Sequence, residues 1–198
     1  NLTQAIGSGW SDKHLRHCLR VAENFTEEQI VSAAQRQLSW THLKTLAYEK
    51  DPLKRNFYLE MAILENWNTR ALADQMDKML YERTAISTKP ETQIAKVLND
   101  LKEDHTLNPE LVFKSSYILD FLGLQGMYSE KDVENALIAN LQQFIMELGS
   151  GFAFLERQKR ISVDAIDYHL DLLFYHRKLK RLVAIDLKLG KFKPEHKA

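Results

Sequence analysis

Apolar residues recur at helical spacing through the first 87 residues, and a residue suited to capping a helix precedes each run. Thr26 and Gln29 have the spacing of a capping box, and Asp51 precedes a proline at the first helical position. The other predicted caps are Ser11, Ser39 and Asn68. We therefore expect this part to be a set of short helices. The stripe expected to face the core from the first helix is Leu15, Cys18, Leu19 and Ala22.

Two tryptophans begin short helices in similar local sequences, Trp40 after Ser39 and Trp67 before Asn68. Such an arrangement is compatible with a helix-turn-helix, whose second helix places polar side chains in a DNA groove. The alternative is a small bundle in which both tryptophans simply pack where helices start. The DNA contacts predicted by the first interpretation are His42, Lys44, Thr69 and Arg70.

Residues 88–128 are predicted to form a helical connector. Thr88 and Asn108 each begin a capping pattern, and no Gly-Ser-rich or Pro-rich stretch separates them. The parts of the chain before and after this connector are therefore expected to pack on one another.

One long helix is predicted between Ser129 and Gly149. Glu134 lies four residues before Ile138 and so continues the apolar stripe of this helix, whereas Glu147 falls on the solvent side. Glu134 is therefore the candidate site residue. A glutamate in the first turn is also favoured by the helix dipole alone, which is the alternative explanation.

Two apolar strands are predicted near the C-terminal end, at 170–176 and 182–188, and both contain charged residues. Burying a charge without a partner costs several kcal/mol, so Asp171, Asp186 and Lys188 call for a functional explanation. If the strands form a hairpin, Asp171 lies opposite Asp186, and Asp186 shares a face with Lys188. The other, core-facing side would carry Val183, Ile185 and Leu187.

Two carboxylates at cross-strand distance repel each other unless a cation lies between them. Mg²⁺ or Mn²⁺ would suit Asp171, Asp186 and the backbone carbonyl of Leu187, because such hard ions take oxygen ligands and leave room for waters and a phosphate oxygen. Lys188 would orient the attacking water or stabilise charge on the phosphate. The pattern therefore indicates metal-dependent phosphodiester hydrolysis.

The composition is that of an ordinary globular protein, with 198 residues of which 44% are hydrophobic and 27% charged. No apolar run approaches the ~20 residues of a membrane span, and the first residues lack a signal-peptide pattern. We therefore expect a cytoplasmic protein without membrane contact. The single cysteine, Cys18, excludes an internal disulfide and a cysteine-based zinc cluster.

The formal net charge is zero, but positive charge is concentrated towards the C-terminal end. Residues 157–198 carry 11 Lys and Arg against 5 Asp and Glu, a charge of +6, so residues 1–156 carry −6. A basic surface around the carboxylates favours a polyanion such as DNA, and RNA also meets this requirement. Alternatively, the basic residues only solubilise a hairpin tip. The predicted nucleic-acid contacts here are Gln158, Arg177, Lys178, Lys180 and Arg181.

Glu134, Asp171 and the triplet 186–188 resemble the PD-(D/E)XK nuclease superfamily, and the longer stretches 38–85 and 171–192 are similar to the YhcG-like bacterial family within it. The chain departs from the superfamily signature at Leu170, where proline often precedes the aspartate, and in carrying aspartate at 186. The resemblance implies a helical, DNA-binding N-terminal domain and a nuclease domain that uses Mg²⁺ or Mn²⁺. The catalytic residues would be Glu134, Asp171, Asp186 and Lys188.

The chain is therefore predicted to be an α+β protein. A helical N-terminal domain, 1–87, precedes the connector and a nuclease-like domain, 129–198, in which a helix is followed by three strands. The superfamily core continues with another helix and strand, so we expect this core to be incomplete at its C-terminal end. A partner subunit or further residues would cover the exposed strand edge, and a homo-oligomer is expected.

The predicted function is that of a metal-dependent DNA endonuclease in repair, recombination or defence. One alternative is a non-catalytic DNA-binding or assembly protein, in which the acids hold a structural ion or pair with Lys188. Another is a metal-dependent phosphoryl hydrolase acting on free nucleotides. The basic C-terminal end favours a polymeric substrate over free nucleotides.

Overall fold

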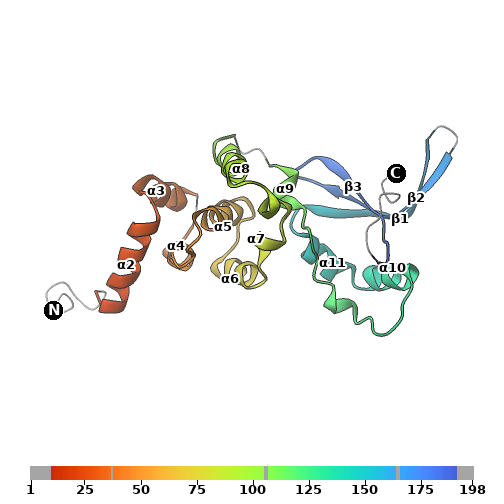
Figure 1. Ribbon diagram of the computed structural model, residues 1–198, viewed down its shortest axis with the longest axis horizontal. Coiled ribbons are helices and arrows are strands. Elements are labelled where there is room, and N and C mark those ends of the chain that lie inside the picture. The colour runs from red at the N-terminus through yellow and green to blue at the C-terminus, as the bar shows by residue number, and fades with distance from the viewer. Residues whose placement is uncertain (1–9, 37, 105–106, 164–165, 191–198) are drawn as a thin grey trace. The chain divides into compact units, whose positions relative to one another are not determined.

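The computed structural model describes residues 10–36, 38–104, 107–163 and 166–190. It divides into two compact units, Asn1–Thr106 and Leu107–Ala198. Unit 1 is built from helices, and unit 2 combines helices with an antiparallel sheet (Figure 1). The predicted α+β organisation, with the strands last, is confirmed. The predicted connector is shared between the units, since the boundary falls inside it. Within the described ranges, none of the helices is long and apolar enough to cross a bilayer.

Unit 1 packs around its central helix, α5, in which Phe57 and Tyr58 are fully buried. This helix contacts α4, α6, α7 and α8. The elements of unit 1 are α2 (Asp12–Asn24), α3 (Glu27–Gln35), α4 (Trp40–Leu46), α5 (Pro52–Leu64), α6 (Thr69–Asp77), α7 (Leu80–Arg83), the 3-10 helix η1 (Ala85–Thr88) and α8 (Glu91–Asp104).

The capping residues predicted for unit 1 begin the helices as expected. Thr26 and Gln29 form both bonds of a capping box, and Asp51 accepts from the first backbone N–H groups of α5. The expected core face of α2 is wrong, because Leu19 is 62% exposed while Val21 is buried. The helix α2 packs on α4 through the adjacent face instead. That face differs from the predicted one by a single residue in helical phase.

Unit 2 contains a three-stranded sheet in the order β1-β2-β3, with both pairs antiparallel. The single helix expected between Ser129 and Gly149 is instead broken at Asn140, whose side-chain amide donates to the carbonyl of Ala136 (2.9 Å) and so competes with the helix backbone. The elements are α9 (Pro109–Val112), η2 (Asp120–Leu122), α10 (Glu130–Ala139), α11 (Leu141–Leu148), β1 (Phe152–Val163), β2 (Ile166–His176) and β3 (Arg181–Ile185).

β3 is shorter than predicted and ends at Ile185, so Asp186 and Lys188 follow the strand rather than lying inside it. Residues 164 and 165, between β1 and β2, lie outside the described residues. The predicted alternation of faces is confirmed, because Val183, Ile185 and Leu187 pack on the core whereas the charged residues are exposed. The core that they join is formed by Leu137, Phe144, Leu148, Phe152, Leu172 and Phe174.

Candidate active site

Asp171 and Asp186 are neighbours across the end of the β2–β3 pair. Leu172 pairs with Ile185, so the same register carried one residue further places Asp171 opposite Asp186. The backbone N–H of Leu187 donates to Oδ2 of Asp171 at 2.7 Å, which fixes this proximity. The two residues are therefore close at this end of the sheet, with Asp171 half-buried and Asp186 exposed. Their joint role in one site stays a prediction.

Gln158 holds the second oxygen of Asp171. Its side-chain Nε2 donates to Oδ1 at 3.0 Å, so both carboxylate oxygens have a donor. Gln158 lies in β1 with a φ of 48°, which departs from strand geometry in the left-handed region that non-glycine residues rarely adopt. Departures of this kind persist where the surrounding structure determines them, often at functional sites.

Lys188 completes a small charged cluster with Asp186 and Glu130. Its Nζ lies 3.1 Å from both carboxylate oxygens of Asp186 and 3.9 Å from Glu130, which in turn accepts from the backbone N–H of Leu189 at 3.0 Å. The hydrogen bond to Asp186 raises the pKa of Lys188 despite slight desolvation, and the charges of Asp186, Glu130 and Asp171 add to it. The side chain is therefore a fixed cation near neutral pH.

Glu134 is buried, as its position in the apolar stripe predicted, with 6% of its surface exposed. Its Oε1 lies 3.2 Å from the guanidinium of Arg157 but accepts no hydrogen bond. Within the described ranges, no group of three acids or other metal-binding side chains lies close enough to hold one ion, so Glu134 does not join Asp171 and Asp186 in such a cluster. Its catalytic role stays a prediction.

Glu147 is not on the solvent side, in contrast to the prediction from helical phase. It pairs with Lys114 at 3.2 Å and accepts from the backbone N–H of Ile118 at 3.1 Å. The side chains of this pair are 12% and 6% exposed. The segment that follows α9 covers this face of α11, which the phase of one helix cannot reveal.

Two residues next to the site were not among the site residues predicted from the sequence. Arg157 precedes Gln158 on β1 and reaches Glu134, and Glu130 at the start of α10 lies beside Lys188. Neither had a signal in the sequence, because each contact depends on how α10 packs against the sheet. An acid in the first turn of a helix is explained by the helix dipole alone.

The predicted basic contacts lie at the opposite end of β3 from Asp186. The turn residues 177–180 precede β3 and Arg181 is its first residue, and five residues of strand correspond to about 17 Å. Arg177, Lys178, Lys180 and Arg181 are exposed. A nucleic-acid backbone that reached both ends would have to extend over several nucleotides.

His42 is a structural residue of unit 1, which corrects its assignment as a DNA contact. It is buried, its Nδ1 lies 3.0 Å from the backbone N and 2.8 Å from the hydroxyl of Ser39, and its Nε2 lies 3.0 Å from the carbonyl oxygen of Trp67. A tautomer protonated on Nε2 satisfies all three bonds, so neither ring nitrogen is left for DNA. Lys44 and Thr69 are half-buried and Arg70 is exposed, and their roles stay predictions.

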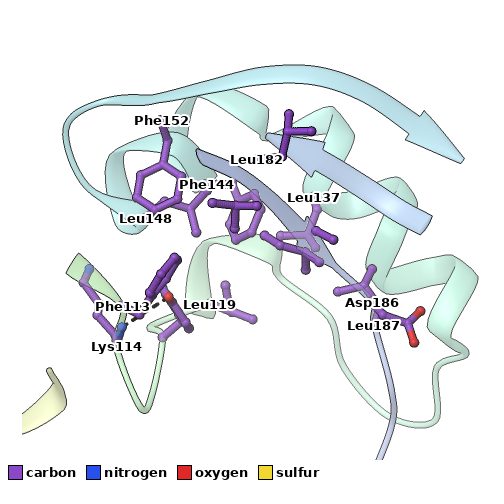
Figure 2. A pocket seen from close by; sticks show the side chains of 14 residues that line it. Phe113, Lys114, Leu119, Leu137, Phe144, Leu148, Phe152, Leu182, Asp186 and Leu187 are labelled. Atoms are coloured by element: carbon purple, nitrogen blue, oxygen red, sulfur yellow. Dashed lines mark hydrogen bonds between the residues drawn. The ribbon is translucent and has the colours of Figure 1, made fainter. Parts of the chain in front are cut away.

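A cavity of about 590 Å³ lies along β3 on the core side of the sheet. Figure 2 shows Asp186 and Lys114 at opposite ends of this cavity, with aromatic and aliphatic side chains such as Phe144 and Leu137 between them. An apolar lining does not suit a phosphate. The chemistry is therefore expected on the exposed face, where Asp186 and Lys188 lie.

Comparison with known proteins identifies both parts of the chain. Residues 110–198 match the family described as the YhcG PDDEXK nuclease domain, and residues 1–83 match the DUF1016 N-terminal domain. The chain belongs to the YhcG-like family. The C-terminal part of this YhcG-like chain is thus a nuclease domain of the PD-(D/E)XK type, and it contains all of Asp171, Asp186 and Lys188.

A curated relative of this YhcG-like chain is the protein named "Putative nuclease YhcG" from Escherichia coli (strain K12). The two are 38% identical over 152 residues, which is 77% of this chain and 40% of the relative. The chain therefore spans about two fifths of the length of that protein. No solved structure matches the chain significantly.

Proposed function

We propose that this YhcG-like chain is a divalent-metal-dependent endonuclease that hydrolyses phosphodiester bonds in DNA. The observation that carries the proposal is the meeting of Asp171, Asp186 and Lys188 at the end of the β2–β3 pair, within a domain of the nuclease type. Two carboxylates and a lysine at one sheet end combine ligands for a cation with a charge for a phosphate.

The donor atoms present suit a hard cation. Asp171, Asp186 and the backbone carbonyl of Leu187 offer oxygen atoms only, and waters together with a phosphate oxygen would complete the six ligands that Mg²⁺ prefers. Bound there, Mg²⁺ or Mn²⁺ would lower the pKa of a water and polarise the phosphate. Because such a site needs only two acids, it is compatible with the lack of a three-acid cluster in the described ranges.

The side chains around the two acids have separate roles in the proposal. Gln158 and the Leu187 N–H orient Asp171, so that its carboxylate keeps one direction. Lys188 stays protonated, since its pKa is raised, and stabilises negative charge on the phosphate in the transition state. Glu134 retains an acceptor oxygen without a hydrogen bond, which suits a role in holding a water.

A non-catalytic DNA-binding protein is the second candidate, favoured by the ion pair between Asp186 and Lys188. In that case the pair would be structural, and the acids would bind no metal. The two candidates differ in cleavage and in metal affinity, and both can be measured on the same variants.

The test incubates the full chain with plasmid and with labelled single-stranded and branched DNA, in Mg²⁺, Mn²⁺ or EDTA. Asp171→Asn, Asp186→Asn and Lys188→Ala are expected to lower the cleavage rate at least about 100-fold. Asp167→Asn is the matched control, because Asp167 is an exposed acid on the same strand that bonds Arg160 and Ser162 instead. It should cut at the wild-type rate.

Calorimetric titration with Mn²⁺ provides a second readout. The wild type should bind the ion, Asp171→Asn should lose it, and Asp167→Asn should keep it. Equal cleavage by all variants, or DNA binding without cleavage or metal uptake by any of them, would contradict the nuclease proposal and support the non-catalytic one.

A further inference from the structure

One face of α2 carries a row of cations outside the carboxylate site. Lys13, Arg16, His17 and Arg20 follow one another at spacings of three, one and three residues, so they lie on one side of the helix. Lys13, Arg16 and Arg20 are exposed. None of these three side chains forms an ion pair within the described ranges.

Two aromatic rings, one from α4 and one from the turn after it, contact α2, and that of Tyr48 lies against this row. The ring of Trp40 is 5.8 Å from that of His14, and the Tyr48 hydroxyl bonds Nδ1 of His17 at 2.9 Å. The guanidinium of Arg20 lies 4.6 Å from the centre of the Tyr48 ring. Although these contacts fix both rings, Trp40 is 40% and Tyr48 50% exposed. We refer to Lys13, Arg16, Arg20, Trp40, Lys44 and Tyr48 as the α2–α4 face.

The electrostatics of the α2–α4 face are positive, although unit 1 belongs to the acidic part of the chain. Partial desolvation and then the charges of Lys44 and Lys13 hold the pKa of His17 below its usual value. Glu49, which follows Tyr48, is bound to Lys54 at 3.3 Å and so is engaged elsewhere. The two acids of α2, Asp12 and Glu23, pair with none of these cations.

We propose that the α2–α4 face binds single-stranded nucleic acid. Unstacked bases would stack on the exposed rings of Trp40 and Tyr48, and Lys13, Arg16 and Lys44 would contact the phosphates. A duplex hides the faces of its bases, so exposed rings combined with cations fit a single strand better than a duplex. The proposal extends the proposed function, on which it rests for nucleic acid as the substrate, by adding a binding surface in unit 1.

The test measures binding without cleavage. A full chain carrying Asp171→Asn is titrated in EDTA into a short labelled DNA strand, into the same sequence as a duplex, and into the RNA equivalent. The combined change Lys13→Gln and Arg16→Gln should lower the dependence of log K on log salt by about 1.4, since each phosphate contact to a single strand contributes about 0.7. Lys96→Gln, an exposed lysine on α8, is the matched control and should change nothing.

The aromatic part of the proposal has its own variants. Trp40→Leu and Tyr48→Leu keep an apolar side chain, and each should weaken single-strand binding at least about fivefold while leaving duplex binding unchanged. Thermal unfolding checks that these variants fold. The proposal fails if the charge variant shows the same salt dependence of binding as Lys96→Gln. It also fails if the ring variants lose affinity for duplex and for single strand equally. Because cleavage is not measured, this failure would leave the nuclease proposal standing.

Discussion

The backbone N–H of Leu187 and the side chain of Gln158 donate to different oxygens of the same carboxylate, that of Asp171, at 2.7 and 3.0 Å. Gln158→Gly removes the second bond and relieves the positive φ of 48°. Relief of the backbone strain at position 158 stabilises the fold by roughly 1 kcal/mol. The conformational entropy of glycine costs roughly 1 kcal/mol, so the two effects nearly cancel. Thermal stability should therefore fall by no more than the value of the lost bond. The cleavage rate should fall by about tenfold, the value of one hydrogen bond to a charged group.

Gln158→Glu distinguishes a role of Gln158 in orienting Asp171 from the mere loss of its hydrogen bond. It places a second negative charge against Asp171 and should lower cleavage further than Gln158→Gly, while tightening Mn²⁺ binding measured by calorimetry. If both variants cut at the wild-type rate, Gln158 does not position Asp171.

The buried carboxylate of Glu134 and the partly exposed guanidinium of Arg157 form a pair of unequal burial, 8% against 44%. Arg157→Met leaves the carboxylate without its cation and should lower the free energy of unfolding by about 2 kcal/mol, less than a fully buried pair because solvent reaches the arginine. Glu134→Gln removes the charge itself and should cost less. Urea unfolding of both variants and of their combination measures the coupling. Additive effects would show that the pair contributes no coupling energy.

The parts of the fold that depend on short stretches of chain could be predicted from sequence. The capping box of Thr26, the faces of β3 and the antiparallel pairing of β2 with β3 all follow from neighbouring residues and from alternation along a strand. The break at Asn140 could not be predicted, because the apolar period continues through it and only the side-chain bond to Ala136 shows the interruption.

The partners of the site residues depend on packing between distant segments. Arg157 reaches Glu134, and Glu130 reaches Lys188, only because α10 lies against the sheet. His42 shows the same limit, since the carbonyl oxygen that meets its Nε2 is 25 residues away. Residue type and helical phase thus indicated which side chains are candidates for the site, but not which groups each of them contacts.

Gly151 lies next to the buried ring of His176, and a side chain there has no room. Its φ is +91°, and an added Cβ would lie 3.0 Å from Nε2 of His176. Gly151→Ala should therefore lower the free energy of unfolding by about 2 kcal/mol or more, from backbone strain together with displacement of the ring. Gly123→Ala is the control. Gly123 also has a positive φ, +63°, but an added Cβ there would have no other atom within 4 Å. Equal losses in urea unfolding would show that the contact with His176 has no cost.

Asp132 gives the start of α10 a dependence on pH. Its carboxylate accepts from the backbone N–H of Ser129 at 2.8 Å and from its hydroxyl at 2.7 Å, and these bonds lower the pKa of Asp132. A lowered pKa in the folded state contributes stability that is present above the unfolded pKa of about 4 and is lost as pH falls through the folded value. Asp132→Ala should therefore lower Tm at pH 7, and its difference from the wild type should shrink as the pH falls below about 4. Asp132→Asn keeps an acceptor without a titrating charge, so its Tm at pH 7 should fall less than that of Asp132→Ala. Its difference from the wild type should also shrink as the pH falls below about 4, because only the wild type titrates at this position. A difference between Asp132→Ala and the wild type that stays constant from pH 7 into the acid range would show that the charge of Asp132 is not what stabilises the cap.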